Sequence, residues 1–256
     1  MYYVVQENVF REENYQGLIN GLDRLQLPYE IVKLIPCDTR MFKFKTKRTD
    51  VFPFGAVKMS WLAKKLNWYP GSQLCDNHDY MVYSKYYKEN LLNYDSKIIK
   101  FGDKDFFNEE LFFARPTHDS KVFTGRVFDM DQWEKFREEK LIDGHSSILS
   151  IDTPIQISSV KKIQKEIRFW IIKGKIITAS QYSLGGRFCT DEFVDEDAFA
   201  YVRKMIHIFE LNETFIMDVC LTNGEYKIVE CGCTNSAGFY KADLQKLLIG
   251  LEEAFN

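Results

Sequence analysis

Apolar residues recur with two different periods along the first part of the chain. Residues 2–6 form an apolar run that predicts a buried strand, whereas 15–27 place leucine and isoleucine at helical spacing. Residues 29–35 again predict a strand, so the chain opens with a strand–helix–strand unit. Such a unit joins parallel strands by a right-handed crossover, and a ligand is expected at their carboxyl ends, near Glu7 and Cys37. The turn after the first strand lacks the glycines of a dinucleotide site, which excludes that function.

The middle of the chain predicts shorter elements separated by turns. A strand near Val51 leads through a turn at Gly55 into a helix that begins near Ala56, and such a helix start can face an anion. The other elements expected before residue 150 are a helix over 85–92, a strand over 111–115, a loop over 116–120, a strand over 122–128 and a helix over 131–140 capped by Asp129 or Asp131.

The last hundred residues favour strands that pair as hairpins. Strands are expected over 155–158, 165–173, 175–181, 215–221 and 226–231, and helices over 199–210 and 243–254. Two of these connections carry glycine where a tight turn needs a positive φ, at Gly174 and Gly224. Antiparallel hairpins with helices set apart from them define an α+β fold rather than a doubly wound sheet.

Composition narrows the class of protein. The 256 residues are 45% hydrophobic, enough to bury a core without disulfides or metal, and charged residues interrupt every apolar stretch, which excludes a transmembrane protein. The net charge of −3 gives no global field for nucleic acid, although lysines and aromatics within 42–69 keep contact with bases open as a less favoured alternative. Six scattered cysteines and an N-terminus without a signal sequence favour the cytoplasm.

Two carboxylates stand in apolar strands on either side of one turn. Asp218 and Glu230 flank the Asn223-Gly224 turn, so we expect them to be near neighbours across one ladder. Burying both without a cation is costly, and Mg²⁺ would remove the penalty by coordinating their oxygens. The alternative is that one carboxylate faces solvent or pairs with a lysine, and spacing alone does not choose between the two.

Charged residues also mark strands earlier in the chain. Strand alternation places Glu166 and Arg168 on one face, which suits either a site or a simple salt bridge. Arg115, Lys121 and Arg126 lie on or between two strands, where they can meet phosphates or remain solvated. A convincing Ser/His/Asp or Cys/His arrangement is absent, so covalent catalysis by a side chain is not expected.

The order of these pieces resembles the ATP-grasp superfamily, and within it a clade common in bacteriophages that is named for two arginines and a lysine. The resemblance covers about residues 111–243. It rests on the strings Ala114-Arg115-Pro116, Lys121 to Gly125, Glu166 to Trp170, Met217-Asp218-Val219, and Glu230 with Asn235 to Tyr240.

The resemblance implies an ATP-grasp fold, in which two α+β subdomains clamp ATP behind a small βαβ N-terminal domain. The boundaries expected are 1–75 for the N-terminal domain and 76–256 for the ATP-grasp domain, with subdomains over 76–153 and 154–256. The implied activity is an ATP- and Mg²⁺-dependent carboxylate–amine ligase that works through an acyl phosphate, forms a C–N bond and releases ADP and phosphate.

The resemblance also assigns residues. Arg168 and Lys121 are expected to act in catalysis. The residues expected to bind ATP are Arg115, Lys121, Ile155, Gln156, Ile157, Ser158, Glu166, Arg168, Asp218 and Glu230. Those expected at the substrate are Tyr182, Arg187, Asn235, Ser236 and Tyr240, with the turn over 183–187 as a mobile lid or an ordinary loop. The metal ligands expected are Asp218, Glu230 and Asn235.

Two departures from the superfamily leave alternatives open. The usual Glu-x-Asn is interrupted by Gly232, and Arg115 stands where many relatives have lysine. A nucleotide-binding module without turnover and an ATP-driven modification of a nucleotide or nucleic acid are therefore the alternative functions. The expected partners are small-molecule or peptide carboxylates and amines, with no membrane, in the cytoplasm of a host cell if the chain is phage-encoded. The sequence names neither substrate and no oligomeric state.

Overall fold

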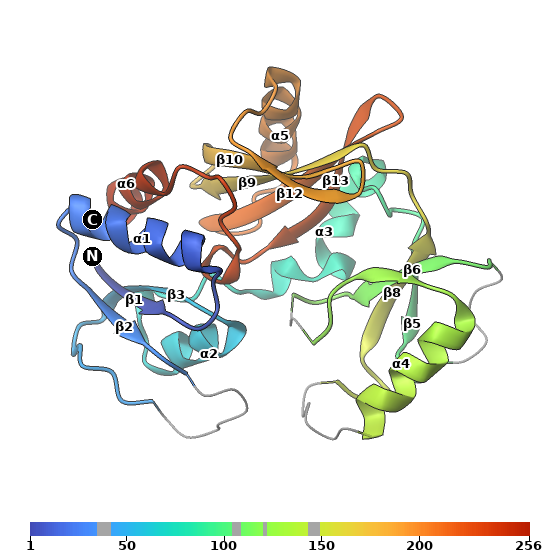
Figure 1. The fold of residues 1–256 in the computed structure, drawn as a ribbon, viewed down its shortest axis with the longest axis horizontal. Helices are drawn as coiled ribbons and strands as arrows, with labels where there is room; N and C mark the ends of the chain where they lie inside the picture. The colour runs from blue at the N-terminus through green and yellow to red at the C-terminus, as the bar shows by residue number, and fades with distance from the viewer. Residues whose placement is uncertain (35–41, 104–108, 120–121, 143–148) are drawn as a thin grey trace. The chain divides into compact units, whose positions relative to one another are not determined.

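The computed structural model describes residues 1–34, 42–103, 109–119, 122–142 and 149–256 (Figure 1). The chain forms two compact units. Unit 1 comprises Met1–Cys75 and Ile163–Asn256, and unit 2 comprises Asp76–Lys162. The chain thus changes units where the sequence predicts its first domain boundary and again shortly after the predicted subdomain boundary. Residues 1–75, however, share a core with the last part of the chain. The predicted division into domains stays a prediction.

Unit 1 begins with a parallel sheet of order β2-β1-β3-β4. Its elements are β1 (Tyr2–Gln6), α1 (Glu12–Arg24), β2 (Tyr29–Val32), β3 (Asp50–Phe54), α2 (Val57–Lys65) and β4 (Tyr69–Pro70). The predicted strand–helix–strand opening is confirmed, although α1 begins three residues earlier than expected. Strand periodicity sends Tyr3 and Phe52 into a core with α1, while Val4 and Val51 face α2.

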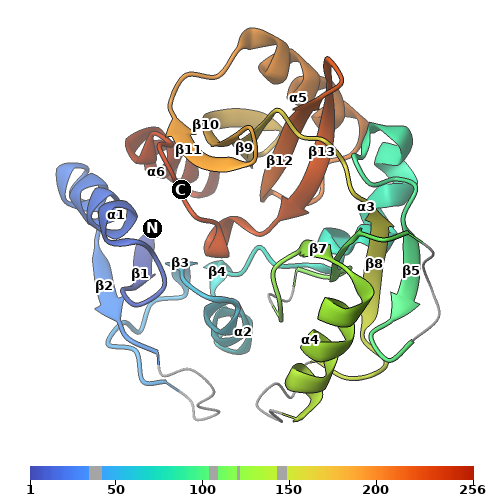
Figure 2. The same cartoon turned by 45° about the vertical axis from the view of Figure 1, so that its right-hand side comes forward.

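A five-stranded antiparallel sheet of order β11-β10-β9-β12-β13 completes unit 1 (Figure 2). Its elements are β9 (Lys165–Ile172), β10 (Lys175–Leu184), β11 (Arg187–Asp191), α5 (Glu196–Ile208), β12 (Thr214–Thr222), β13 (Glu225–Gly232), the 3₁₀ turn Thr234–Ser236 and α6 (Leu244–Phe255). Both predicted hairpin turns are confirmed, with positive φ at Gly174 and Gly224. Strand β11 was not predicted: the expected lid over 183–187 is the β10–β11 hairpin connection.

Alternation along β9 separates the two faces of this sheet. Phe169 packs edge-on against Phe199 of α5, with ring centroids 5.2 Å apart. Trp170 and Ile172 lie on the opposite face, in the core that α6 shares with β1 and β3. Arg168 has the same parity as Trp170 and is therefore directed to the α6 side of the sheet.

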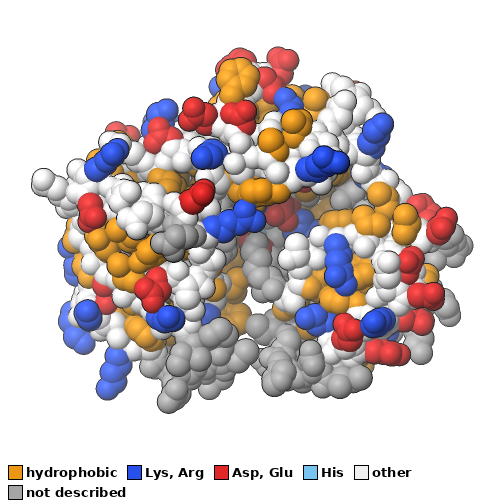
Figure 3. All heavy atoms as spheres, viewed as in Figure 1, with side chains coloured by type: hydrophobic (Ala, Val, Ile, Leu, Met, Phe, Trp, Pro, Cys, Tyr) orange, Lys and Arg blue, Asp and Glu red, His pale blue; other side chains and the backbone are white. Residues whose placement is uncertain are grey.

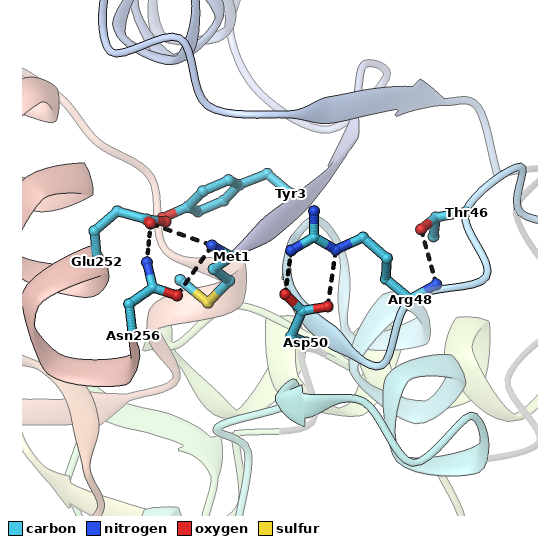
Figure 4. A network of polar contacts seen from close by, with 7 residues as sticks. All are labelled: Met1, Tyr3, Thr46, Arg48, Asp50, Glu252 and Asn256. Carbon is cyan, nitrogen blue, oxygen red and sulfur yellow. Dashed lines mark hydrogen bonds and ion pairs between the residues drawn. The ribbon is translucent and has the colours of Figure 1, made fainter.

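Polar contacts also join the ends of the chain within unit 1. The Tyr3 hydroxyl on β1 donates to Glu252 Oε1 on α6 at 2.6 Å, and Asn256 donates to the same carboxylate (Figure 4). Figure 4 also shows the pairing of Arg48 with Asp50 just before β3. Long-range contacts of this kind, rather than the neighbouring sequence, fasten the parallel sheet to the rest of unit 1.

Unit 2 contains a four-stranded sheet of order β5-β8-β6-β7. Its elements are α3 (Tyr80–Tyr87), β5 (Lys97–Lys100), β6 (Phe112–Pro116), β7 (Arg126–Phe128), α4 (Met130–Ile142) and β8 (Pro154–Ser159), with 3₁₀ turns at Asp76–His78 and Lys88–Asn90. One face packs on α4 through an aromatic core centred on Trp133. Among the helices of the described ranges, none is both long and apolar enough to cross a membrane.

Unit 2 corrects three predictions. The helix expected over 85–92 begins earlier, because Asp79 caps it by accepting from Met81 N at 2.8 Å. The strand expected over 122–128 forms only at Arg126–Phe128. The strand over 155–158 belongs to the sheet of unit 2 rather than to the later hairpins. Of the two predicted caps for α4, Asp129 accepts from Gln132 N at 2.8 Å.

Candidate functional site

Three neighbouring strands of unit 1 bring charged side chains to one level of the sheet. Asp218 on β12 is the register partner of Arg168 on β9 and of Glu230 on β13. Directly opposite residues project to the same face, so the three side chains converge there. The expectation that Asp218 and Glu230 are neighbours across one ladder is confirmed.

A β-bulge makes this convergence possible. From the turn onward, Thr222 pairs with Glu225 and Val219 with Ile228, a register that would set Glu230 opposite Met217 on the other face. The register shifts between Val219 and Asp218, so that Asp218 pairs with Glu230. One extra residue in β13 therefore turns the second carboxylate towards the first.

Arg168 supplies the cation beside the buried carboxylate. Its Nε and Nη2 donate to Asp218 Oδ1 and Oδ2 at 2.8 and 2.7 Å, and its Nη1 donates to the Gly238 carbonyl oxygen at 3.2 Å. Glu230 Oε1 lies 3.8 Å from Nη2. The Asp218 side chain is only 2% exposed, compared with 24% for Glu230. A guanidinium, and not the lysine or solvent considered from the sequence, thus neutralises Asp218.

Burial and mutual charge shift the titration of this cluster. Burial raises the pKa of Glu166, and the charges of Asp218 and Glu230 raise it further. For Arg168, burial alone would lower the pKa, but the charge and hydrogen bonds of Asp218 outweigh it and hold the pKa above its usual value. The site therefore keeps a permanent cation among three carboxyl groups.

Two tyrosines cover the guanidinium. The rings of Tyr182 and Tyr240 stack with centroids 4.9 Å apart, and the guanidinium carbon of Arg168 lies 5.7 and 5.1 Å from their centres. The Tyr182 hydroxyl lies 3.3 Å from oxygens of both Glu166 and Asp218. Burial raises the pKa of Tyr182, so the hydroxyl stays protonated and donates. Both predicted substrate residues thus join the charged cluster.

Asn235 has a different environment from the one predicted. Its side chain is fully buried, and Nδ2 donates to the carbonyl oxygens of Pro53 and Gly71 at 2.8 and 3.1 Å. Its Oδ1 accepts from Gln73 N at 2.7 Å and from Cys233 Sγ at 3.2 Å. These bonds fasten the loop after β13 to the parallel sheet. The metal-ligand role of Asn235 stays a prediction, and binding a metal would require these bonds to break.

The remaining predicted residues lie apart from this cluster in the fold. Arg187 is exposed on β11, and Ser236 is half-buried in the 3₁₀ turn that contains Asn235. In unit 2, Arg115 on β6 is the register partner of Gln156 on β8. Lys121 lies outside the described residues.

The four predicted residues of β8 divide between the faces of their sheet. Ile155 and Ile157 point into the aromatic core. Gln156 and Ser158 alternate to the other face, where Gln156 Nε2 donates to Ser96 Oγ at 2.9 Å. Arg115 shares that second face through its pairing with Gln156.

Sequence reasoning missed three groups around the cluster. They are the carbonyl of Gly238, which accepts from Arg168, and the pair Arg11 and Phe188, whose guanidinium carbon and ring centre lie 4.3 Å apart. Phe188 in turn lies 6.1 Å from the Tyr240 ring. The position of Arg11 soon after the first strand was the available signal, because carboxyl ends of parallel strands attract ligands.

The donor set suits a hard divalent cation that also binds phosphate. Across the described ranges, no group of three or more His, Cys, Asp or Glu side chains is arranged to hold a metal by itself. Mg²⁺, however, is ordinarily bound by one or two carboxylates together with substrate phosphates rather than by a protein cage. Asp218 and Glu230, facing each other across the ladder, fit that requirement.

Solved structures of similar fold cover almost the whole chain. D-alanine--D-alanine ligase from Bacillus anthracis aligns with 99% of this chain and 96% of its own at 13% identity and a TM-score of 0.60. D-cycloserine synthetase DcsG gives 100%, 99%, 10% and 0.63, and the ATP-grasp ligase PsnB with its minimal precursor gives 99%, 98%, 11% and 0.57. At these identities the likeness establishes the fold alone. No match was found among curated proteins.

The sequence itself matches a family model over residues 50–250, that of the ATP-grasp domain of family 3 in the clade named for two arginines and a lysine. The match covers more than half of the chain and agrees with the fold of the solved relatives. The α+β ATP-grasp fold and the resemblance drawn from the sequence are both confirmed. The chain therefore belongs to this two-arginine, one-lysine clade of the ATP-grasp family.

Proposed function

We propose that this chain is an ATP-dependent ligase that joins a carboxylate to an amine. The observation that carries the proposal is the convergence of Glu166, Arg168, Asp218 and Glu230 on adjacent strands of an ATP-grasp chain. Relatives of the same fold include D-alanine--D-alanine ligase and PsnB, an ATP-grasp ligase solved with a precursor peptide. A small molecule or a peptide is accordingly the proposed substrate class.

The proposed reaction proceeds through an acyl phosphate. A carboxylate oxygen attacks the γ-phosphorus of ATP, and the bond from that phosphorus to ADP breaks. The amine then attacks the acyl carbon, inorganic phosphate leaves with the electrons of the C–O bond, and the nitrogen loses a proton. Neither step needs a nucleophile from the protein, which mainly has to position the reactants and stabilise charge.

Magnesium is the proposed cofactor, with Asp218 and Glu230 as its protein ligands. When bound, Mg²⁺ would neutralise phosphate charge on the nucleotide. Arg168 is suited to hold a phosphate or a substrate carboxylate near these acids. Three of its five N–H groups donate to Asp218 and Gly238, which leaves two for an anionic ligand.

The other site residues enter the proposal through the family resemblance. Arg115 and Lys121 would contact the ATP phosphates, and the backbone over 155–158 would meet the adenine. The residues proposed to face the acceptor are Tyr182, Arg187, Ser236 and Tyr240. We place the reaction in the cytoplasm, that of a host cell if a bacteriophage encodes the chain.

The test is product analysis with substrate pools. The purified chain is incubated with Mg-ATP and pools of carboxylic acids, amino acids and short peptides, and nucleotides are separated. ADP and phosphate released only when acid and amine are both present would support the proposal. Release of AMP would exclude the acyl phosphate. ATP binding without turnover across all pools would instead support a nucleotide-binding module.

Glu230→Gln and Glu225→Gln provide a matched pair of variants for this assay. Both residues lie on β13, but Glu225 is exposed and pairs with Thr222 at the turn, away from Arg168. We expect ADP release to fall only in Glu230→Gln. Equal activity of the two variants would remove Glu230 from the proposed site.

A further inference from the structure

A strongly basic surface lies on unit 1 in a chain whose net charge is negative. Residues 42–69 contain six lysines and one arginine against a single aspartate, a net charge of +6 within a chain of net charge −3. The one aspartate, Asp50, is already paired with Arg48. Like charges gathered in this way repel one another, so their clustering favours an anionic partner.

The first part of this surface is the basic strap, which we define as residues 42–49. Phe42 and Phe44 are half-buried and pack against the core beside α2, with ring centroids 4.9 Å apart. Alternation sends Lys43, Lys45 and Lys47 outward, where all three are exposed. The strap is thus apolar on its inner side and cationic on its outer side.

Hydrogen bonds to a buried carboxylate fix the strap in place. Glu30 on β2 is 7% exposed and accepts from Lys45 N at 3.0 Å and from Thr46 N at 3.1 Å. This charge is consumed by backbone donors rather than by the lysine side chains. Within the described ranges, the ion pairs of the structure include none of Lys43, Lys45 or Lys47.

The second part of the surface is the outer face of α2. Met59, Leu62 and Ala63 are buried beneath the helix, whereas Lys64 and Lys65 are exposed. Trp61 is 48% exposed. Positions 58, 61 and 65 recur every three to four residues, so Trp61 lies between lysines along one stripe of the helix.

The strap and the stripe belong to one surface. Phe42, Phe44, Met59 and Leu62 share a core cluster, so the two segments cover the same face of the parallel sheet. Both views place α2 on the side of that sheet away from α1 and α6 (Figures 1 and 2). Lys and Arg side chains gather at the lower left of the face shown in Figure 3, where the strand edge and strap lie.

We propose that this surface binds single-stranded nucleic acid. Exposed lysines on two segments can follow a run of phosphates, and an indole between lysines offers a platform on which an unpaired base can stack. A duplex keeps its bases stacked inside and would leave the indole without a partner. An acidic peptide would use the lysines but has no need of a half-exposed indole, so the nucleic acid is favoured.

The test measures binding of fluorescently labelled 20-nucleotide oligo(dT) and oligo(rU) to the full chain, without ATP, between 50 and 200 mM salt. The strap variant is Lys43→Glu/Lys45→Glu/Lys47→Glu. Its matched control is Lys175→Glu/Lys204→Glu/Lys246→Glu, which reverses the same number of exposed charges elsewhere on unit 1. We expect the strap variant to lose about two units of the log–log salt slope, at about 0.7 per phosphate contact. The control should retain most of its affinity.

Trp61→Ala tests the stacking platform separately. We expect about a tenfold loss of affinity with an unchanged salt slope, and quenching of Trp61 fluorescence in the parent chain on titration with oligonucleotide. Thermal denaturation of every variant checks that the fold is retained.

Three outcomes would overturn the proposal. One is absence of binding at 50 mM salt; another is an equal loss of affinity in the strap and control variants. The third is competition by poly-glutamate as strong, charge for charge, as by the oligonucleotide, which would assign the surface to acidic peptides. Because no ATP is present, these results are independent of the ligase proposal.

Discussion

Asp218 accepts two hydrogen bonds from Arg168, one on each carboxylate oxygen, at 2.8 and 2.7 Å. The two residues come from adjacent strands and are almost completely excluded from solvent. The carboxylate that we propose as a metal ligand is therefore also the counter-ion of a buried guanidinium. Substitutions at this pair will change stability as well as activity.

Asp218→Asn should destabilise unit 1 by about 3–5 kcal/mol, because it leaves a buried guanidinium without its main counter-charge. Glu230, 3.8 Å away, compensates only in part. Urea denaturation followed by fluorescence measures the change. The double variant Arg168→Met/Asp218→Leu removes both charges and should recover most of the loss. Wild-type stability of Asp218→Asn would show that the pair is not energetically coupled.

Glu230→Gln should spare stability and remove Mg²⁺-dependent turnover. Its side chain is 24% exposed and lies beyond hydrogen-bonding distance of the Arg168 nitrogen, so little folding energy is at stake. A carboxylate that helps to hold a metal should cost several kcal/mol of transition-state stabilisation, about a hundredfold or more in ADP release. Denaturation and ADP release on the same preparation check the two effects. A loss of both together would indicate a structural role.

Glu166→Gln should stabilise the chain at neutral pH. Burial and the neighbouring carboxylates raise the pKa of Glu166 above its usual 4.5, so the folded state binds the proton more tightly than the unfolded chain does. The stability gained from protonated Glu166 is present at low pH and is lost as the pH rises through the raised pKa.

At pH 7 the neutral glutamine should therefore raise Tm by roughly 2–4 °C, which corresponds to about 1 kcal/mol for a chain of this size. The difference from the parent should shrink as the pH falls towards 4. Thermal melts from pH 4 to 8 measure it, with Glu225→Gln as the control on an exposed position. A Tm difference independent of pH would contradict this origin.

Asn235→Ala should destabilise unit 1 by about 2–4 kcal/mol, because two buried carbonyl oxygens and the Gln73 N–H lose their partner. Asn235→Asp should do the same, since a carboxylate cannot donate to Pro53 and Gly71. If Asn235 instead serves mainly as a metal ligand, Asn235→Asp will keep the parent's stability and its affinity for Mg-ATP. Denaturation and Mg-dependent ATP binding separate the two roles.

Much of the fold follows from local sequence. The periods of apolar residues over 2–6 and 15–27 specified the opening unit, and the Asn-Gly and Lys-Gly turns specified two hairpins. Aspartates ahead of α3, α5 and α6 accept backbone hydrogen bonds, so the boundaries of those helices were written into a few neighbouring residues. The missed strand β11 has no comparable signal, because most of its residues are exposed and lack alternation.

The candidate site shows where local reasoning ends. The sequence by itself determined that Asp218 and Glu230 flank one hairpin turn and that Arg168 shares a strand face with Glu166, since turn chemistry and strand alternation act over a few residues. Only the tertiary structure decided that a bulge turns Glu230 to the face of Asp218, that Arg168 pairs with Asp218, and that Asn235 fastens a distant sheet. These contacts depend on strands that are far apart in the chain, and their register is set by packing of the whole core.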